Sequence, residues 1–276
     1  MAVNENGKGG GRIMNEKRRI SLLFFVLVMI FFYLPIIMLV TLSFNNSKNF
    51  IWTGFSLKWY IELFTSSPGL WQAFGRSILI GLTSSVFSVF VATFGAIGIK
   101  WYNSRMKSYV KFLNYIPLIL PDLIIGVALL IFFNMQIGAY QGMELGMKTI
   151  FIAHTTFNIP FSLFIIMARL DEFDYSIVEA ARDLGANEFQ TLLKVILPSM
   201  MPGIISAFLM AMTLSLDDFV ITSFVTGTNS NTLPVQIYSM IKFGVSPVIN
   251  ALSTILIIGT VVLSLSSRKL QKYMLN

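Results

Sequence analysis

Long apolar runs separated by short polar segments make up most of this 276-residue chain. A helix needs about 20 predominantly apolar residues to cross a bilayer core. Six runs approach that length, which predicts an all-α integral membrane protein with six transmembrane helices and both termini on the same side. We place the spans at about residues 20–42, 73–99, 110–133, 149–167, 203–225 and 248–267.

The segments outside these runs define the ends of the chain. Residues 1–13 are polar and glycine-rich, and we interpret them as an extension or a cloning remnant at the start of a disordered N-terminus, residues 1–19. The first apolar run is too long for a signal peptide and lacks a small-residue cleavage site, so we interpret it as a span. The transmembrane domain therefore covers residues 20–267, and residues 268–276 form a tail.

A polar and aromatic segment, residues 44–70, follows the first span. Trp52 and Trp59 in this segment and Trp71 directly after it are spaced as interfacial anchors. The stretch from Leu57 to Phe64 is expected to form a short helix at the membrane surface.

Residues 174–198 form the longest polar interruption on the side of the termini, and their pattern predicts a short first helix. Ser176 and Glu179 have the S-x-x-E spacing of a capping box, so the helix is expected to begin near Ser176. Gly185 is suited to end it, because glycine adopts the left-handed conformation of a helix terminus at little cost. The apolar positions repeat on one face: Ile177, Ala180, Ala181 and Leu184.

A second short helix is expected after this turn, with Asn187 as its N-terminal cap. Pro198 and Pro202 are expected to break its pattern. Periodicity alone is equally compatible with an amphipathic loop lying on the bilayer surface. The apolar positions of this helix are Phe189, Leu192, Leu193 and Ile196.

The same segment resembles the EAA loop of ABC importer permeases. The resemblance rests on Glu179-Ala180-Ala181, Gly185, Val195 and Leu197-Pro198 at the spacing of that family, although the family usually has Ile where this chain has Val195. It implies a coupling helix that docks into a groove on a cytoplasmic ATPase, with Glu179, Ala180, Ala181 and Gly185 as the coupling residues. The small alanines would permit close approach, and the glycine would permit the turn.

Composition excludes a soluble domain. Apolar residues make up 55% of the chain, charged residues only 12%, and the mean hydropathy is +0.74. The absence of cysteine excludes disulfides and thiolate metal sites. A single histidine, His154, is too few for a His-based metal site, and we interpret it as a residue with satisfied hydrogen bonds or one that packs between helices.

The net charge of +7 is a topology signal rather than a sign of nucleic-acid binding, because the basic residues lie in the short loops. Basic residues concentrate on the cytoplasmic side of membrane proteins. The termini and the 174–198 loop are therefore predicted to be cytoplasmic. Of the 20 Lys and Arg residues, those expected outside are Lys48, Lys58, Arg76, Lys148 and Lys242.

No Walker motif, catalytic triad or paired-histidine site is present, so the chain is not expected to be an enzyme or to hydrolyse ATP itself. No cofactor is expected in this chain. ATP and Mg²⁺ would belong to partner ATPase subunits.

Three acidic residues fall within predicted spans, where a charge costs at least about 2.5 kcal/mol and usually faces a cavity. Asp122 follows Pro121, so it either caps a restarted half-helix or contacts a substrate. Asp217 and Asp218 are adjacent, and successive helical positions diverge by about 100°, so only one is expected to face the pathway. Carboxylates along a path favour a cation, and Tyr238 would either add a cation–π contact or anchor at the interface.

A wider resemblance covers nearly the whole chain from Met14. The stretches LPDLIIGVALL, AHTTFNIPFSLF, LSLDDFVITSFVTG and LPVQIYSMIKFGVSP are similar to the PotC-type permeases of spermidine/putrescine ABC importers. This resemblance implies the type I ABC importer permease fold in a bacterial inner membrane. It also implies a second homologous permease, two ATPase subunits and an external polyamine-binding protein, working by alternating access.

Three alternatives stay open. A permease of the same superfamily for an opine, an iron chelate or a phosphonate would share the loop and most of the topology. An ion-coupled secondary carrier would need no ATPase, and the coupling loop is evidence against it. A membrane enzyme would need a nucleophile, a metal site or a paired base, whereas the sequence offers isolated carboxylates.

Overall fold

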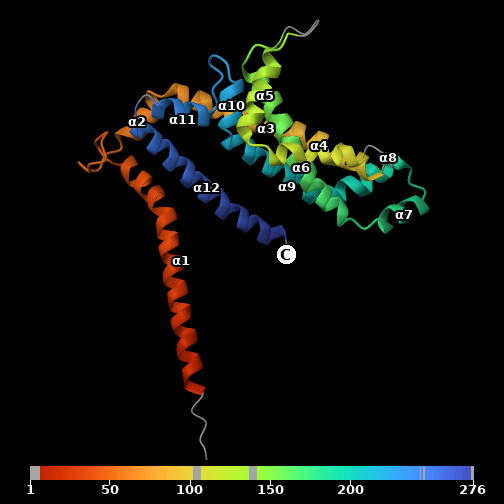
Figure 1. The fold of residues 1–276 in the computed structure, drawn as a ribbon, viewed down its shortest axis with the longest axis horizontal. Helices are drawn as coiled ribbons and strands as arrows, with labels where there is room; N and C mark the ends of the chain where they lie inside the picture. Colours follow the sequence, from red (N-terminus) through yellow and green to blue (C-terminus); the bar gives the residue numbers. More distant parts are fainter. Residues whose placement is uncertain (1–6, 102–106, 137–141, 243, 245, 275–276) are drawn as a thin grey trace, which may run out of the picture. The chain divides into compact units, whose positions relative to one another are not determined.

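The computed structural model describes residues 7–101, 107–136, 142–242, 244 and 246–274 (Figure 1). Within these ranges the regular secondary structure is helical, apart from one isolated β-bridge between Asn45 and Phe55. The helices are α1 (Gly7–Ser43), α2 (Lys58–Thr65), α3 (Pro68–Trp101), α4 (Lys107–Ile119), α5 (Asp122–Asn134), α6 (Met147–Asp171), α7 (Ser176–Asp183), α8 (Glu188–Thr191), a π-helical turn η1 (Leu192–Ile196), α9 (Leu197–Asp217), α10 (Val220–Val225), α11 (Leu233–Lys242) and α12 (Pro247–Met274).

The chain divides into two compact units. The first contains Met1–Pro68 and Ile241–Asn276, and the second contains Gly69–Met240. The ends predicted as a disordered N-terminus and a tail fall in the first unit, where α1 starts at Gly7 and α12 ends at Met274. Residues 1–6 and 275–276 lie outside the described residues, as does Arg105 of the predicted cytoplasmic turn.

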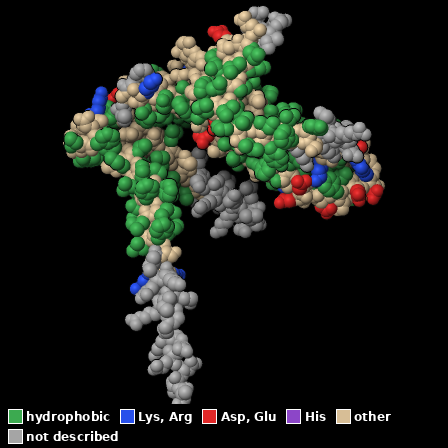
Figure 2. Space-filling model, in the orientation of Figure 1, with side chains coloured by type: hydrophobic (Ala, Val, Ile, Leu, Met, Phe, Trp, Pro, Cys, Tyr) green, Lys and Arg blue, Asp and Glu red, His purple; other side chains and the backbone are tan. Residues whose placement is uncertain are grey.

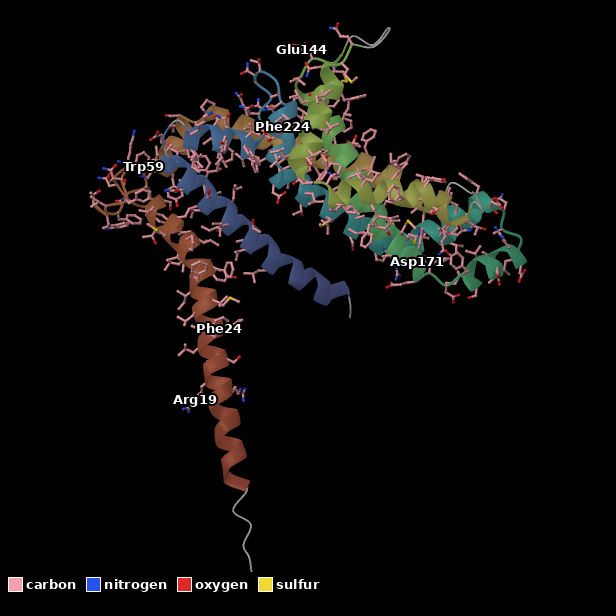
Figure 3. All side chains as sticks on the ribbon, in the orientation of Figure 1. Arg19, Phe24, Trp59, Glu144, Asp171 and Phe224 are labelled. Atoms are coloured by element: carbon pink, nitrogen blue, oxygen red, sulfur yellow. The ribbon has the colours of Figure 1, made fainter. Side chains whose placement is uncertain are left out.

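In the first unit α12 packs against α1 and α2. The loop before α2 is organised by Asn45, whose side-chain amide donates to the backbone carbonyls of Asn49 and Ile51 and whose Oδ1 accepts from the Thr53 amide. Trp59 donates its indole N–H to the Asn45 carbonyl at 2.6 Å and is buried, so the prediction that it anchors at the interface is wrong (Figure 3). Its indole hydrogen bond is satisfied inside the loop instead.

In the second unit the main packing joins α6 to α9. The facing positions are small or apolar, with Ala207 and Ala211 of α9 fully buried against Leu163 and Ile166 of α6. Gly203 lies so close to Arg169 that an added Cβ would sit 2.8 Å from the Arg169 Cβ. Small residues at these positions let the two backbones approach closely, as is usual between membrane helices.

Within the described residues, four helices are long and apolar enough to cross a membrane. They are Ser21–Ser43, Pro68–Trp101, Met147–Asp171 and Glu188–Asp217. The pair formed by α4 and α5 makes a fifth if the two count as one span, and the apolar part of α12, Pro247–Val262, is shorter. The all-α membrane fold is therefore confirmed, whereas the count of six spans stays a prediction.

Two of the predicted spans are broken. α4 and α5 are bent by 109° relative to each other at Leu120 and Pro121, where the sequence predicted an interruption. The fifth span, predicted at 203–225, instead belongs to a helical run from Glu188 that stops at Asp217. Asp218 is extended, and the short helix α10 follows.

The prediction that Pro198 and Pro202 end the second loop helix is wrong, because α8, η1 and α9 follow one another without a gap. Pro198 lies in the first turn of α9, directly after the π-turn. The preceding π-turn widens the backbone, and the Leu197 N–H donates to the carbonyl of Leu192 instead of a residue four positions earlier.

We expect Gly203→Ala to destabilise the protein by about 1–3 kcal/mol, because the added methyl overpacks the α6–α9 interface. The matched control is Gly98→Ala in α3, where an added Cβ has no heavy atom within 4 Å and alanine favours the helix. The thermal unfolding temperature of both variants in detergent would check this. Equal unfolding temperatures would contradict the tight packing at Gly203.

Candidate functional site

The helix predicted to couple to an ATPase is α7, and it begins at Ser176 as expected. The predicted capping box is wrong, because no side chain caps this helix through its N-cap residue. Asp174 takes that role instead: its Oδ1 accepts the Ser176 N–H at 2.9 Å. This hydrogen bond from the Ser176 backbone lowers the pKa of the Asp174 carboxyl, since it favours the ionised form.

The end of α7 is a glycine-dependent turn. Gly185 has φ +84°, its N–H donates to the Arg182 carbonyl, and the Ala186 N–H donates to the Ala181 carbonyl at 3.0 Å. These two bonds form a Schellman motif, which satisfies carbonyl groups that the helix end leaves free. The predicted end of the helix at Gly185 is therefore confirmed.

The next helix begins with the predicted Asn187 cap. Asn187 Oδ1 accepts the Gln190 N–H at 2.8 Å, and Gln190 Oε1 accepts the Asn187 N–H at 3.1 Å. Arg182 and Glu188 form an ion pair of 3.5 Å across the turn. The two loop helices are thus tied to each other by this ion pair.

The base of the loop is fixed to the ends of α3 and α6. Lys100 pairs with Asp171 at 2.6 Å, and the rings of Trp101 and Tyr175 lie 5.7 Å apart. Val178 is the buried residue of α7. The loop is therefore positioned by contacts on one side and presents its other side outward.

The outward side of α7 carries the family motif. Glu179 and Ala180 are exposed, Ile177 is 46% exposed and Leu184 is 89% exposed. Apolar side chains this exposed on a polar loop are typical of an interaction surface. Figure 2 shows acidic and basic side chains gathered around α7 and α8, at the end of the second unit away from Glu144 (Figure 3).

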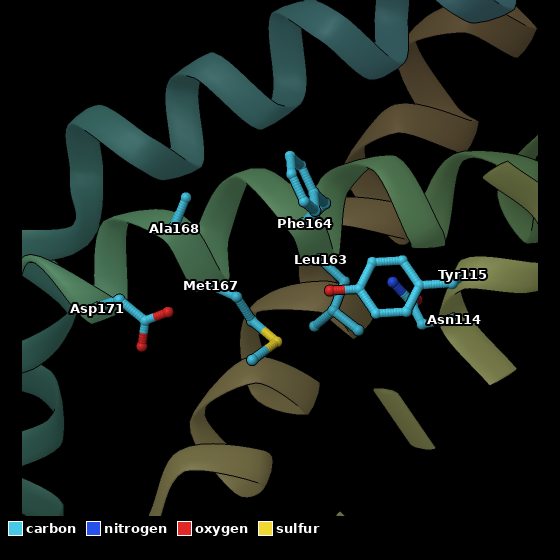
Figure 4. A pocket seen from close by; sticks show the side chains of 7 residues that line it. All are labelled: Asn114, Tyr115, Leu163, Phe164, Met167, Ala168 and Asp171. Carbon is cyan, nitrogen blue, oxygen red and sulfur yellow. The ribbon is translucent and has the colours of Figure 1, made fainter. Parts of the chain in front are cut away.

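Three hollows lie in or near the loop, and one of about 270 Å³ is lined by Ala181, Leu184 and Gly185. An open groove of about 630 Å³ lies between the end of α3 and the loop, with Trp101, Val178 and Phe189 among its walls. A smaller pocket of about 180 Å³ lies between α4 and α6 (Figure 4), and its only charged wall, Asp171, is paired with Lys100. The residues that line this pocket are Asn114, Tyr115, Leu163, Phe164, Met167, Ala168 and Asp171.

The second predicted site lies at the break between α9 and α10, where Asp218 acts as a cap. Its Oδ1 accepts the Ile221 N–H at 3.2 Å, and its Oδ2 accepts the Thr222 N–H at 2.8 Å and the Thr222 hydroxyl at 2.6 Å. The Nε2 of His154 lies 3.3 Å from the same Oδ2, and the Asp218 side chain is only 8% exposed. Asp218 therefore satisfies the free N–H groups of α10.

Asp217 is the last residue of α9 and is exposed. Asp122, the first residue of α5, is also exposed, and α5 packs against α10, the helix that follows Asp217 and Asp218. Its side chain makes no capping hydrogen bond, so the capping role considered for Asp122 is not observed. The structure thus brings Asp122, Asp217 and Asp218 to one region, at the starts and ends of broken helices.

Tyr238 lies beside this region. Its ring centroid is 4.6 Å from that of Phe219, the residue after Asp218, and its side chain is 53% exposed. Packing of α5 on α10 completes the surroundings, because Gly126 lies against Ile221 and Phe224. The residues predicted to couple to an ATPase precede the other end of the run from Glu188 to Asp217, so they are separate from this region: Glu179, Ala180, Ala181 and Gly185.

Sequence reasoning missed the partners of Asp218. His154 is satisfied and buried, as predicted, but it bonds to Thr222 and to Ser215 rather than merely packing. The spacing of Asp218 and Thr222, four residues apart, could have predicted this contact. At that spacing an acidic cap can accept a hydrogen bond from a hydroxyl in the first turn of the helix. Within the described residues, no group of three His, Cys, Asp or Glu side chains is arranged to hold a metal ion.

Comparison with known families identifies the class of protein. Residues 86–274 match the family described as the binding-protein-dependent transport system inner membrane component. The chain belongs to this family. It is a multi-pass permease subunit of an ABC transport system.

Particular relatives refine this assignment. The spermidine/putrescine transport system permease protein PotC of Escherichia coli (strain K12) is 37% identical over 246 residues, which cover 89% of this chain and 91% of that protein. The putrescine transport system permease protein PotI of the same strain is 41% identical over 234 residues, covering 84% and 83%. The resemblance to PotC-type permeases is therefore confirmed.

A solved structure shares the fold. It belongs to a bacterial ABC transporter involved in the import of the acidic polysaccharide alginate, with a TM-score of 0.69 and 16% identity over 98% of this chain and 99% of that one. At this identity the likeness extends to the fold alone. The ABC importer permease fold expected from the sequence is confirmed.

We expect Gly185→Ala to loosen the coupling loop, because φ +84° costs a residue with a Cβ about 1–2 kcal/mol. An added Cβ would meet no heavy atom within 4 Å, so the effect would come from the backbone alone. Hydrogen exchange at the Ala186 amide should become faster by on the order of tenfold. Gly185→Asn is the matched control and should exchange more slowly than Gly185→Ala, since asparagine tolerates this conformation. Identical exchange in the two variants would contradict this account.

Proposed function

We propose that this chain is the membrane subunit of an ATP-driven importer of polyamines, spermidine or putrescine. The observation that carries the proposal is the identity of 37% and 41%, over most of each chain, to permeases named for spermidine and putrescine transport. The carboxylates gathered at two helix breaks support a cationic substrate rather than an opine, an iron chelate or a phosphonate.

The electrostatics of the α9–α10 break support a cation site. A helix C-terminus carries a partial negative charge and a helix N-terminus a partial positive charge. Asp218 offsets the positive end of α10, whereas Asp217 adds its charge to the negative end of α9. The break is therefore electronegative where Asp217 is exposed, whereas the charge of Asp122 is partly offset by the positive end of α5.

In this proposal Asp217 and Asp122 contact the ammonium groups of the substrate, and Tyr238 supplies an aromatic face beside them. Asp218 belongs to the site as the cap that holds the break in place. Discontinuous helices with polar groups at the break are a recurring design of membrane transport sites.

The loop at the other end of α9 would couple transport to ATP hydrolysis. Glu179, Ala180, Ala181 and Gly185 would contact one of two ATPase subunits, which bind ATP and Mg²⁺. The exposed Ile177 and Leu184 support this contact, because they offer apolar surface to a partner. The further partners would be a second homologous permease and an external polyamine-binding protein.

The loop and the termini would be cytoplasmic, because basic residues of the predicted loops concentrate on that side. The membrane would be the bacterial inner membrane. Transport would proceed by alternating access, in which closure of the ATPases moves α7 and α8 and exposes the acidic break first to one side and then to the other.

Uptake of radiolabelled spermidine by cells carrying the assembled transporter tests this function. Asp217→Asn should lower ATP-dependent uptake at least about tenfold, since a charge-assisted hydrogen bond contributes about 1.5–3 kcal/mol. Complex assembly should be unchanged because Asp217 is exposed, and Asp217→Glu, which retains the charge, should keep most of the uptake. An assembled transporter with active ATPases that takes up no polyamine would refute the substrate and keep the permease class.

Glu179→Arg should prevent the ATPase subunits from co-purifying, because it reverses the charge on the outward face of α7. The variant should still insert into the membrane, since Glu179 is exposed. Glu144→Arg is the control, as it makes the same charge change on an exposed residue at the other end of the second unit (Figure 3). Normal ATPase binding by Glu179→Arg would count against the coupling role.

A further inference from the structure

One row of hydrogen-bonded side chains joins four helices beneath the acidic break. His154 of α6 is 2% exposed, and each of its ring nitrogens meets a hydroxyl group from another helix. Its Nδ1 lies 2.6 Å from Ser215 Oγ of α9, and its Nε2 lies 2.8 Å from Thr222 Oγ1 of α10. The hydroxyl of Ser84 of α3 donates to Ser215 Oγ at 3.3 Å.

The contacts of Thr222 determine which groups donate and which accept between His154, Thr222 and Asp218. An ionised carboxylate only accepts hydrogen bonds, so the single hydroxyl proton of Thr222 goes to Asp218 Oδ2 at 2.6 Å. Thr222 Oγ1 must then accept from His154, which places a proton on Nε2. Nε2 also lies 3.3 Å from Asp218 Oδ2.

The other half of the row completes the assignment. With the proton on Nε2, Nδ1 of a neutral imidazole is an acceptor. Ser215 can donate to it, because Ser215 in turn accepts from Ser84. A neutral His154 with its proton on Nε2 therefore satisfies every contact in the row, and all of its hydrogen-bonding capacity is used.

Counting hydrogen bonds in the same way distinguishes Asp218 from Asp217. Asp218 already receives two backbone N–H groups, the Thr222 hydroxyl and His154 Nε2. Its carboxylate is buried and has little capacity left for a ligand. Asp217, one residue earlier, is exposed at the end of α9.

We propose that His154 is a positioning residue of the transport pathway: through Nε2 it holds Asp218 as the anchor of α10, and so leaves Asp217 as the carboxylate of the pair that meets the cationic substrate. This proposal rests on the proposed polyamine function. In this proposal Nε2 of His154 positions Asp218. If His154 only filled space, a substitution that keeps a polar group at Nε2 and one that keeps it at Nδ1 would have the same effect.

Two substitutions separate the two sides of the ring. The amide of His154→Gln reaches the position of Nε2 and can donate to Thr222 and Asp218, whereas the shorter amide of His154→Asn reaches only the position of Nδ1, near Ser215. Uptake of radiolabelled spermidine by the complete transporter is the first readout. We expect His154→Gln to stay near the wild-type rate and His154→Asn to fall about tenfold, the change that corresponds to about 1.4 kcal/mol.

Thermal unfolding of the purified complex is the second readout and needs no substrate. Because contacting residues give non-additive effects, His154→Asn and Asp218→Asn together should lower the unfolding temperature by clearly less than the sum of the two single shifts. His154→Asn combined with Gly185→Ala is the control pair, and its shifts should add, since Gly185 lies in the loop between α7 and α8 and shares no partner with His154.

Equal uptake in His154→Gln and His154→Asn would overturn the proposal, and so would additive shifts for the His154 and Asp218 pair. If the wild-type transporter takes up no spermidine, the proposed substrate fails instead. The unfolding measurements then still decide whether His154 anchors Asp218.

Discussion

The free N–H groups at the start of α10 are the constraint on which the acidic site depends. A helix that restarts inside an apolar environment must find partners for its first N–H groups, because each unsatisfied group costs several kcal/mol. Asp218 meets this need with both carboxylate oxygens, and Thr222 and His154 hold that carboxylate in turn. The carboxylate next to the exposed Asp217 is thus committed to the start of α10.

The apolar runs predicted most of the helices, because a bilayer span imposes a length and a composition that can be read directly from the sequence. The coupling loop was also largely predictable. Gly185 and Asn187 act through bonds to near neighbours, so their roles follow from local spacing. Asp174 was missed as the cap of α7 because Ser176 already stands where a capping serine is expected. An aspartate two residues before that position can serve as the cap equally well.

Other features depend on contacts that the sequence pattern does not contain. His154 lies 61 residues from Ser215 and 68 from Thr222, so no local spacing connects them. Trp59 was mistaken for a surface anchor because an indole suits both an interface and a buried hydrogen bond. The helix through Pro198 was missed because periodicity does not reveal a π-turn that absorbs the proline.

The unbroken helical run from Glu188 to Asp217 gives the molecule a long rod between its two sites. Its 30 residues span about 45 Å at a rise of 1.5 Å per residue. The rod is packed along α6, so the loop and Asp217 are joined through one closely packed pair of helices. Asp218 is held by α6 and α10 instead. Two neighbouring carboxylates thus belong to different helices: Asp217 ends one, and Asp218 caps the next.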